Sequence, residues 1–109
     1  MNVIPDNSIV VSDISTNTVK LRVKGSESVK TVEDLGFLVS GQFMVKTVKD
    51  EGEKLELIKY LVNFDAFFVF GYGGYPSEIM GFYKEQNVYT DKYKIISWSD
   101  PNHYRIEEK

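Results

Sequence analysis

A continuous apolar run over residues 66–70 is the strongest pattern in the hydrophobic and polar positions of this chain. Runs of this length without polar alternation are typical of a strand that is buried on both faces of its sheet. A flexible segment of glycines and tyrosines follows over residues 71–76, and Ser77 can cap a short helix over residues 77–86. The pattern therefore predicts a central strand that leads through a loop into a helix, in which Ile79, Phe82 and Tyr83 share one face.

Residues 19–24 alternate strictly between apolar and basic side chains, which predicts a strand with one face on the core. Its three cations, expected to face water, are Lys20, Arg22 and Lys24. These cations could meet phosphates or an acidic partner. The simpler interpretation is a solvated strand face on which lysine discourages pairing at a sheet edge. Further strands are expected over residues 8–13 and 42–47.

The main helix is expected from about Val48 to Asn63, because residues 47–50 form a capping pattern and acidic side chains favour the positive end of the helix dipole. Its predicted apolar stripe consists of Leu55, Ile58, Leu61 and Val62. Asp50 and Lys54 have the spacing of an ion pair on one helix face. A shorter helix is expected to begin near Thr31, after a loop over residues 25–28.

Residues 93–98 and 103–107 flank the sequence Asp100-Pro101-Asn102, which suits a type I turn and predicts a β-hairpin. The order of elements predicts an α+β fold. We expect a single, mostly antiparallel sheet with one long and one short helix packed on one face. A chain of 109 residues fits one domain, over residues 1–109.

Composition narrows the classes of function. The chain contains no cysteine, which excludes disulfides, thiolate nucleophiles, zinc ribbons and iron–sulfur clusters. Its first residues lack the pattern of a secretory signal, and no apolar run is long enough for a membrane span, so a cytoplasmic location is expected. The net charge of -3 argues against general nucleic-acid binding and mildly favours a basic partner.

No set of side chains indicates catalysis. The only histidine, His103, lies near Ser97, Ser99 and Asp100, but a tight solvated turn lacks an oxyanion hole, which favours a surface histidine. The acidic residues 50–53 lack the ligand spacing of a calcium loop. We therefore expect no enzymatic activity, no metal and no cofactor.

The loop over residues 71–76 resembles a phosphate-binding motif only in part. Pro76 stands where a dinucleotide fingerprint has its third glycine, and no lysine follows at the helix start. Tyr72 and Tyr75 on a glycine-rich backbone favour a protein-binding surface instead. Recognition of single-stranded nucleic acid by Tyr93, Tyr104, Lys94 and Arg105 is a lesser option, since the chain is acidic.

These features predict a protein-binding module, and the leading hypothesis is a bacterial immunity or inhibitor protein that occludes a basic toxin such as a nuclease. The residues predicted to contact that partner are Asp50, Glu51, Glu53, Glu56, Tyr72, Tyr75 and Tyr83. One alternative is a domain that binds a small molecule or nucleotide, or a minor enzyme, with its pocket between the glycine loop over residues 71–76 and the long helix. Another is a homo-oligomer joined through the edge of the terminal hairpin.

Overall fold

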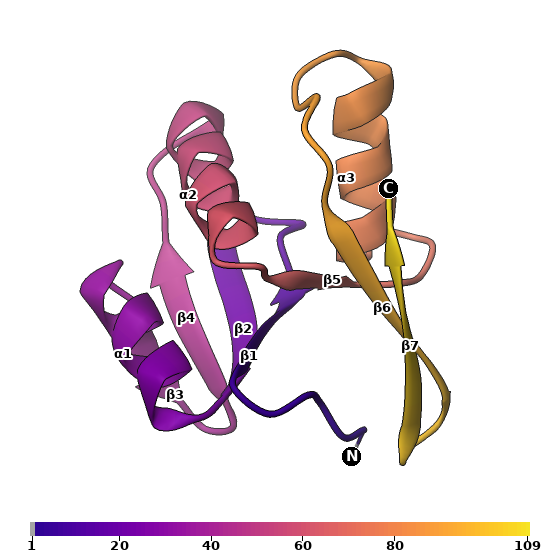
Figure 1. Cartoon of the computed structure of the whole chain (residues 1–109). Helices are drawn as coiled ribbons and strands as arrows, with labels where there is room; N and C mark the ends of the chain where they lie inside the picture. The colour runs from indigo at the N-terminus through magenta and orange to yellow at the C-terminus, as the bar shows by residue number, and fades with distance from the viewer. Residues whose placement is uncertain (1) are drawn as a thin grey trace.

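The computed structural model describes residues 2–109 and contains a seven-stranded mixed sheet with three helices (Figure 1). The elements are β1 (Ser8–Asp13), β2 (Thr18–Lys24), α1 (Ser26–Asp34), β3 (Leu38–Ser40), β4 (Phe43–Thr47), α2 (Glu51–Asn63), β5 (Phe67–Val69), α3 (Pro76–Glu85), β6 (Lys94–Asp100) and β7 (His103–Glu108). The strand order is β3-β4-β2-β1-β5-β6-β7. β5 is parallel to β1 and β6, and the other neighbours are antiparallel. The predicted α+β class with a mostly antiparallel sheet is confirmed.

The main core lies between the sheet and all three helices, which cover the same face. Val32 of α1, Ile58 of α2 and Met80 of α3 are fully buried in one cluster with Leu21 and Phe68 from the sheet. Figure 1 shows α2 and α3 standing on the same side of β5. One-sided covering is the arrangement that the alternating strand pattern predicts.

The opposite face of the sheet carries a smaller apolar cluster and is covered by the N-terminal segment instead of a helix. Ile4 packs there with the buried Val10 and Ile96. The indole N–H of Trp98 donates to the Val3 carbonyl at 2.6 Å, and the Val3 N–H donates to the Pro101 carbonyl at 2.8 Å. These two bonds hold the segment against the β6–β7 hairpin.

The central apolar run is less buried than its sequence predicts. Phe68 points into the main core and is fully buried, but Phe67 and Val69 point to the thinly covered face and are half-buried. Phe70 lies beyond β5 and is 49% exposed. The prediction of burial on both faces is therefore wrong for most of the run, because no helix in the described part of the chain covers the second face.

The alternating strand is confirmed as β2, with Val19 and Leu21 buried and Lys20 exposed. Arg22 is half-buried, and this burial lowers the pKa of its guanidinium. Because β2 lies between β1 and β4, it is not an edge strand. The interpretation that lysine protects a sheet edge here is wrong.

The predicted position of the first helix is wrong. α1 begins at Ser26, within the segment expected to be a loop, and ends at Asp34, close to the expected start. The Thr31 hydroxyl does not cap a helix, since it donates to the Glu27 carbonyl one turn earlier. The short edge strand β3 was not predicted, whereas β4 confirms the strand expected over residues 42–47.

The long helix α2 begins at Glu51 because Asp50 caps it, accepting a hydrogen bond from the Glu53 N–H at 2.9 Å. The predicted ion pair between Asp50 and Lys54 is wrong. Lys54 is only 4% exposed, and its ammonium donates to the Ile14 carbonyl at 3.1 Å while lying 3.5 Å from the Glu51 carboxylate. This lysine ties α2 to the chain immediately after β1.

The remaining predicted elements are confirmed within two or three residues. α3 begins at Pro76 instead of Ser77, as expected for proline at the first helical position, and β6 and β7 form the terminal hairpin. None of the helices in residues 2–109 combines the length and the apolar composition that a membrane crossing requires.

We predict that Lys54→Ala lowers the free energy of unfolding by about 2 kcal/mol, because the buried Ile14 carbonyl loses its donor. Lys59→Ala is the matched control, since Lys59 is exposed on the same helix and should change stability by less than about 0.5 kcal/mol. Urea denaturation measures both values. Equal effects of the two substitutions would contradict the role assigned to Lys54.

Candidate protein-binding surface

Exposed aromatic side chains gather on α3 and on the loop before it. Tyr72 is 76% exposed, Tyr75 is 50% exposed and Phe82 is 56% exposed. Large aromatic residues that stay accessible to solvent are typical anchors of protein interfaces. We call this region the α3 surface and define it by Tyr72, Tyr75, Glu78, Ile79, Gly81, Phe82 and Glu85.

The loop over residues 71–75 is held in place by the first turn of α3. The Glu78 carboxylate accepts hydrogen bonds from the N–H groups of Gly73 at 3.0 Å and Gly74 at 3.1 Å. The Ser77 hydroxyl accepts from the Gly71 N–H at 3.0 Å and lies 3.3 Å from the Gly71 carbonyl, to which it can donate. Gly73 and Gly74 both have positive φ, which explains why this bonding pattern needs glycine. The loop predicted to be flexible is thus bonded at several backbone groups.

Two aromatic contacts orient the tyrosines of this loop. The ring of Tyr75 lies directly on Gly71, so that a Cβ atom at Gly71 would come within 2.3 Å of the ring. Phe70 and Tyr72 form an edge-to-face pair with ring centroids 5.6 Å apart. Side chains that are oriented before binding lose less conformational entropy when a partner arrives. The loop therefore presents two pre-oriented aromatic anchors.

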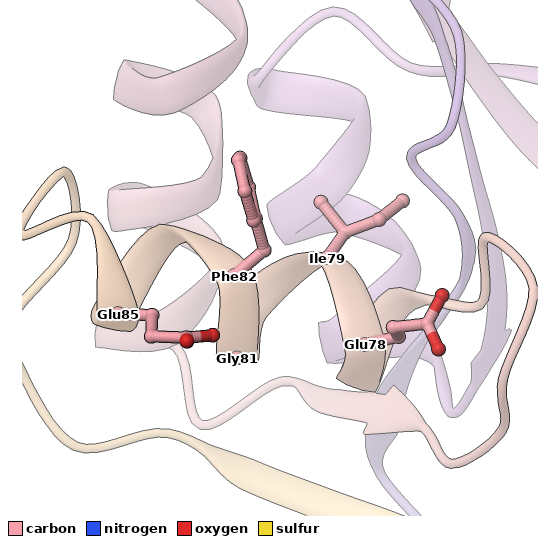
Figure 2. Close-up of a pocket in the computed structure, with 5 residues that line it drawn as sticks. All are labelled: Glu78, Ile79, Gly81, Phe82 and Glu85. Atoms are coloured by element: carbon pink, nitrogen blue, oxygen red, sulfur yellow. The ribbon is translucent and has the colours of Figure 1, made fainter.

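A shallow groove of about 610 Å³ is lined by residues of α3 (Figure 2). Figure 2 shows Ile79 and Phe82 projecting from the same side of the helix, with Gly81 between the positions of Glu78 and Glu85. The groove thus combines an apolar wall with a carboxylate toward each end. This composition suits a partner that presents an apolar side chain with a cation on each side of it.

Gly81 has no packing reason to be glycine. A Cβ atom at this position would have nothing within 4 Å, and the residue lies inside a regular helix. Glycine in a helix interior costs about 1 kcal/mol relative to alanine. Because glycine has no side chain, another molecule can approach the α3 backbone closely at Gly81, in the middle of the groove.

The predicted face shared by Ile79, Phe82 and Tyr83 does not exist as one buried face. Met80 and Tyr83 point into the core, Ile79 is half-buried and Phe82 faces solvent. The buried side of α3 is centred on Met80, which moves Phe82 to the outside. Tyr83, which the sequence predicts to contact a partner, is therefore buried. Phe82 is exposed and is available for contact instead.

Tyr83 and Glu51, both predicted to contact a partner, contact each other. The Tyr83 hydroxyl donates to the Glu51 carboxylate, and Tyr83 is only 7% exposed. Burial and this carboxylate raise the pKa of Tyr83 above its usual value. Since Glu51 also lies near Lys54, the three side chains form one network that joins α2 to α3.

The other predicted acidic residues do not form a single patch. Asp50 caps α2, and Glu56 lies about 140° around the helix from Glu51 at 3.6 residues per turn. Glu56 lines a separate hollow of about 180 Å³ that also contains Tyr60, and Glu53 is half-buried. Among the predicted contact residues, only Tyr72 and Tyr75 belong to the α3 surface. Sequence interpretation missed Glu78, Gly81 and Glu85, although an unexplained helix glycine was a usable signal.

The structure offers no good geometry for phosphate binding at the glycine loop, for catalysis at His103 or, within residues 2–109, for a metal site. A phosphate at the glycine loop would compete with the Glu78 carboxylate for the N–H groups of Gly73 and Gly74. His103 Nδ1 lies 2.8 Å from Asp100 on the exposed hairpin turn, while the Ser99 hydroxyl lies near the His103 carbonyl and not its ring. Within residues 2–109 there is no group of three or more acidic or histidine side chains placed to hold a metal ion.

Comparison with protein families, characterised proteins and solved structures finds no match to this chain. A function for the α3 surface must therefore follow from its own geometry and charge.

We predict that Glu78→Ala releases the loop, so that amide hydrogen exchange at Gly73 and Gly74 becomes faster. Loss of these bonds should also cost about 1 kcal/mol of stability, the usual net contribution of a protein hydrogen bond. NMR-detected exchange measures the first effect and urea denaturation the second. Glu85→Ala is the control, since Glu85 is exposed near the other end of α3, and equal exchange rates in both variants would contradict the prediction.

We predict that protein stability falls as the pH rises above about 10, the ordinary pKa of tyrosine. The unfolded chain loses the Tyr83 proton there, whereas the folded protein retains it because its pKa is raised. Tyr83→Phe should remove this contribution and flatten the fall. At neutral pH it should cost about 1–2 kcal/mol through loss of the bond to Glu51. Denaturation midpoints measured against pH test this, with the exposed Tyr72→Phe as control.

Proposed function

We propose that this chain is a protein-binding module whose α3 surface occludes a basic partner. The concrete hypothesis is a bacterial immunity or inhibitor protein that blocks a toxin domain, such as a nuclease, in the cytoplasm. The mechanism is steric and electrostatic: aromatic anchors fill the contact while carboxylates meet cations of the partner. No catalytic step is required of this chain.

The observation that carries this proposal is Gly81 in the middle of the groove. The position is open, and alanine would favour the helix there, so glycine is explained best by a requirement at the surface itself. Close approach of a partner to the α3 backbone is such a requirement. Phe82 lines the groove beside it and provides apolar contact area, and the oriented Tyr75 lies at the start of the same helix.

Charge supports a basic partner over an acidic one. Glu78 and Glu85 line the groove, and the only cation of α3, Lys84, lies over the ring of Tyr93 at 5.8 Å. The chain as a whole has a net charge of -3. Complementary charge of this kind mainly accelerates association and selects among partners, so binding should weaken as salt rises.

The decisive variant is Gly81→Ala. We predict that it raises the melting temperature, because alanine favours the helix by up to about 1 kcal/mol, yet weakens partner binding by about tenfold or more, which corresponds to about 1.4 kcal/mol. Gly52→Ala is the matched control, since Gly52 is also a helical glycine at which a Cβ atom would meet no clash, but it lies outside the groove. It should raise the melting temperature without weakening binding.

The partner is obtained by affinity capture from the native host, and the protein encoded beside this chain is tested first. Calorimetric titration of the purified partner then gives the affinities of the wild type and both variants. Unchanged affinity for Gly81→Ala would exclude the groove as the contact. A melting-temperature increase with a nucleotide or metabolite, in the absence of any protein partner, would favour small-molecule binding instead.

A further inference from the structure

The terminal strand β7 leaves one edge of the sheet open. All six of its residues are exposed, and among residues 2–109 its only strand partner is β6. An open edge presents unpaired N–H and C=O groups that can bond another strand. The opposite edge is the much shorter β3. β7 is therefore the principal place where this sheet could extend.

The hydrogen bonds of β6 and β7 show which backbone groups face the open edge. Tyr93 and Lys109 exchange two hydrogen bonds, at 3.2 and 2.8 Å. In an antiparallel pair such bonded positions alternate along the strands, so Arg105 and Glu107 also bond inward to β6. The N–H and C=O groups of Tyr104, Ile106 and Glu108 consequently point outward to the open edge.

The central side chains of β7 are charged on one face and apolar on the other. Arg105 and Glu107 lie on one face and form an ion pair at 3.1 Å. Tyr104 and Ile106 lie on the other face and are 40% and 38% exposed. A cation and an anion two residues apart, centred on an apolar residue, make this strand complementary to an antiparallel copy of itself.

We propose that two copies of this chain pair through β7, antiparallel and related by a two-fold axis that passes between their Ile106 residues. In this register Ile106 faces Ile106 of the second copy, and Arg105 of each copy faces Glu107 of the other. The outward groups of Tyr104 meet those of Glu108 of the second copy. The outward N–H and C=O groups of Tyr104, Ile106 and Glu108 are then all directed at the strand of the second copy, with which they can form hydrogen bonds.

Charge selects this register over its neighbours. A slide of one residue would set outward backbone groups against inward ones, so only slides of two residues keep the bonding pattern. A two-residue slide in one direction places Arg105 opposite Arg105 of the second copy. A two-residue slide in the other direction places Glu107 opposite Glu107 of the second copy. Like charges directly opposite each other destabilise a strand pair, whereas the proposed register contains two attractive pairs.

The interface is small, since it consists of one strand from each copy. Interfaces below about 1,200 Å² are typical of weak and transient association. We therefore expect a dimer that forms at high protein concentration and weakens with added salt, because its ion pairs are exposed. The α3 surface takes no part in it, so dimerisation and partner binding can be tested separately.

Sedimentation velocity over a range of protein concentrations tests the proposal. The wild type should show a concentration-dependent dimer, and R105E and E107R should each be monomeric because each places like charges across the axis. An equimolar mixture of R105E and E107R should form a heterodimer, since every facing pair is then attractive. The double variant R105E/E107R keeps the composition and net charge of the wild type and should dimerise as the wild type does.

Ile106→Pro tests the backbone bonds separately. The Ile106 N–H faces the open edge, so proline there removes a bond of the dimer without removing a bond to β6, and the folded monomer should persist by circular dichroism. A wild type that stays monomeric up to its solubility limit would overturn the proposal. So would dimers of undiminished strength in R105E, in E107R and in Ile106→Pro. Gly81→Ala should leave the dimer unchanged, which separates this test from that of the α3 surface.

Discussion

One-sided covering of the sheet is the constraint from which the other features follow. Within residues 2–109 the three helices and the main apolar cluster occupy one face of seven strands, and no helix packs on the other face. The second face therefore depends on the N-terminal segment, which Trp98 and Pro101 hold through hydrogen bonds to Val3. The outermost strand β7 receives no cover from a helix, and this leaves its edge and both of its faces accessible to solvent.

The buried network around Lys54 explains why the acidic start of α2 is not a free binding surface. An ammonium group in an apolar environment needs hydrogen-bond acceptors and a counter-charge, and Lys54 obtains them from the Ile14 carbonyl and Glu51. Glu51 in turn accepts a hydrogen bond from Tyr83, which links α3 to α2. Two of the four charges that appear in the sequence as a patch therefore serve the fold: Glu51 links α2 to α3, and Asp50 caps α2.

Sequence patterns predicted the fold class and most strands because the periodicity of apolar residues reflects burial directly. They failed where a tertiary contact decided the outcome. Lys54 has the spacing of a surface ion pair, and only the position of Ile14, in the segment after β1, turns it inward. Phe82 and Tyr83 are adjacent aromatic residues, and the angle at which α3 packs on the sheet determines which one is buried. The start of α1 was missed because Gly25 precedes it without a side-chain cap.

The two proposed contacts use different faces of the molecule and can act together. In the proposed dimer the two-fold axis is perpendicular to the sheet, so both copies present α3 on the same side of one continuous sheet. Two identical binding surfaces on one side allow a partner with repeated sites to engage both, and the second contact then forms at a high effective concentration. Because the strand pairing is weak by itself, such a partner would also stabilise the dimer, through the same free-energy coupling that links any two binding events on one molecule.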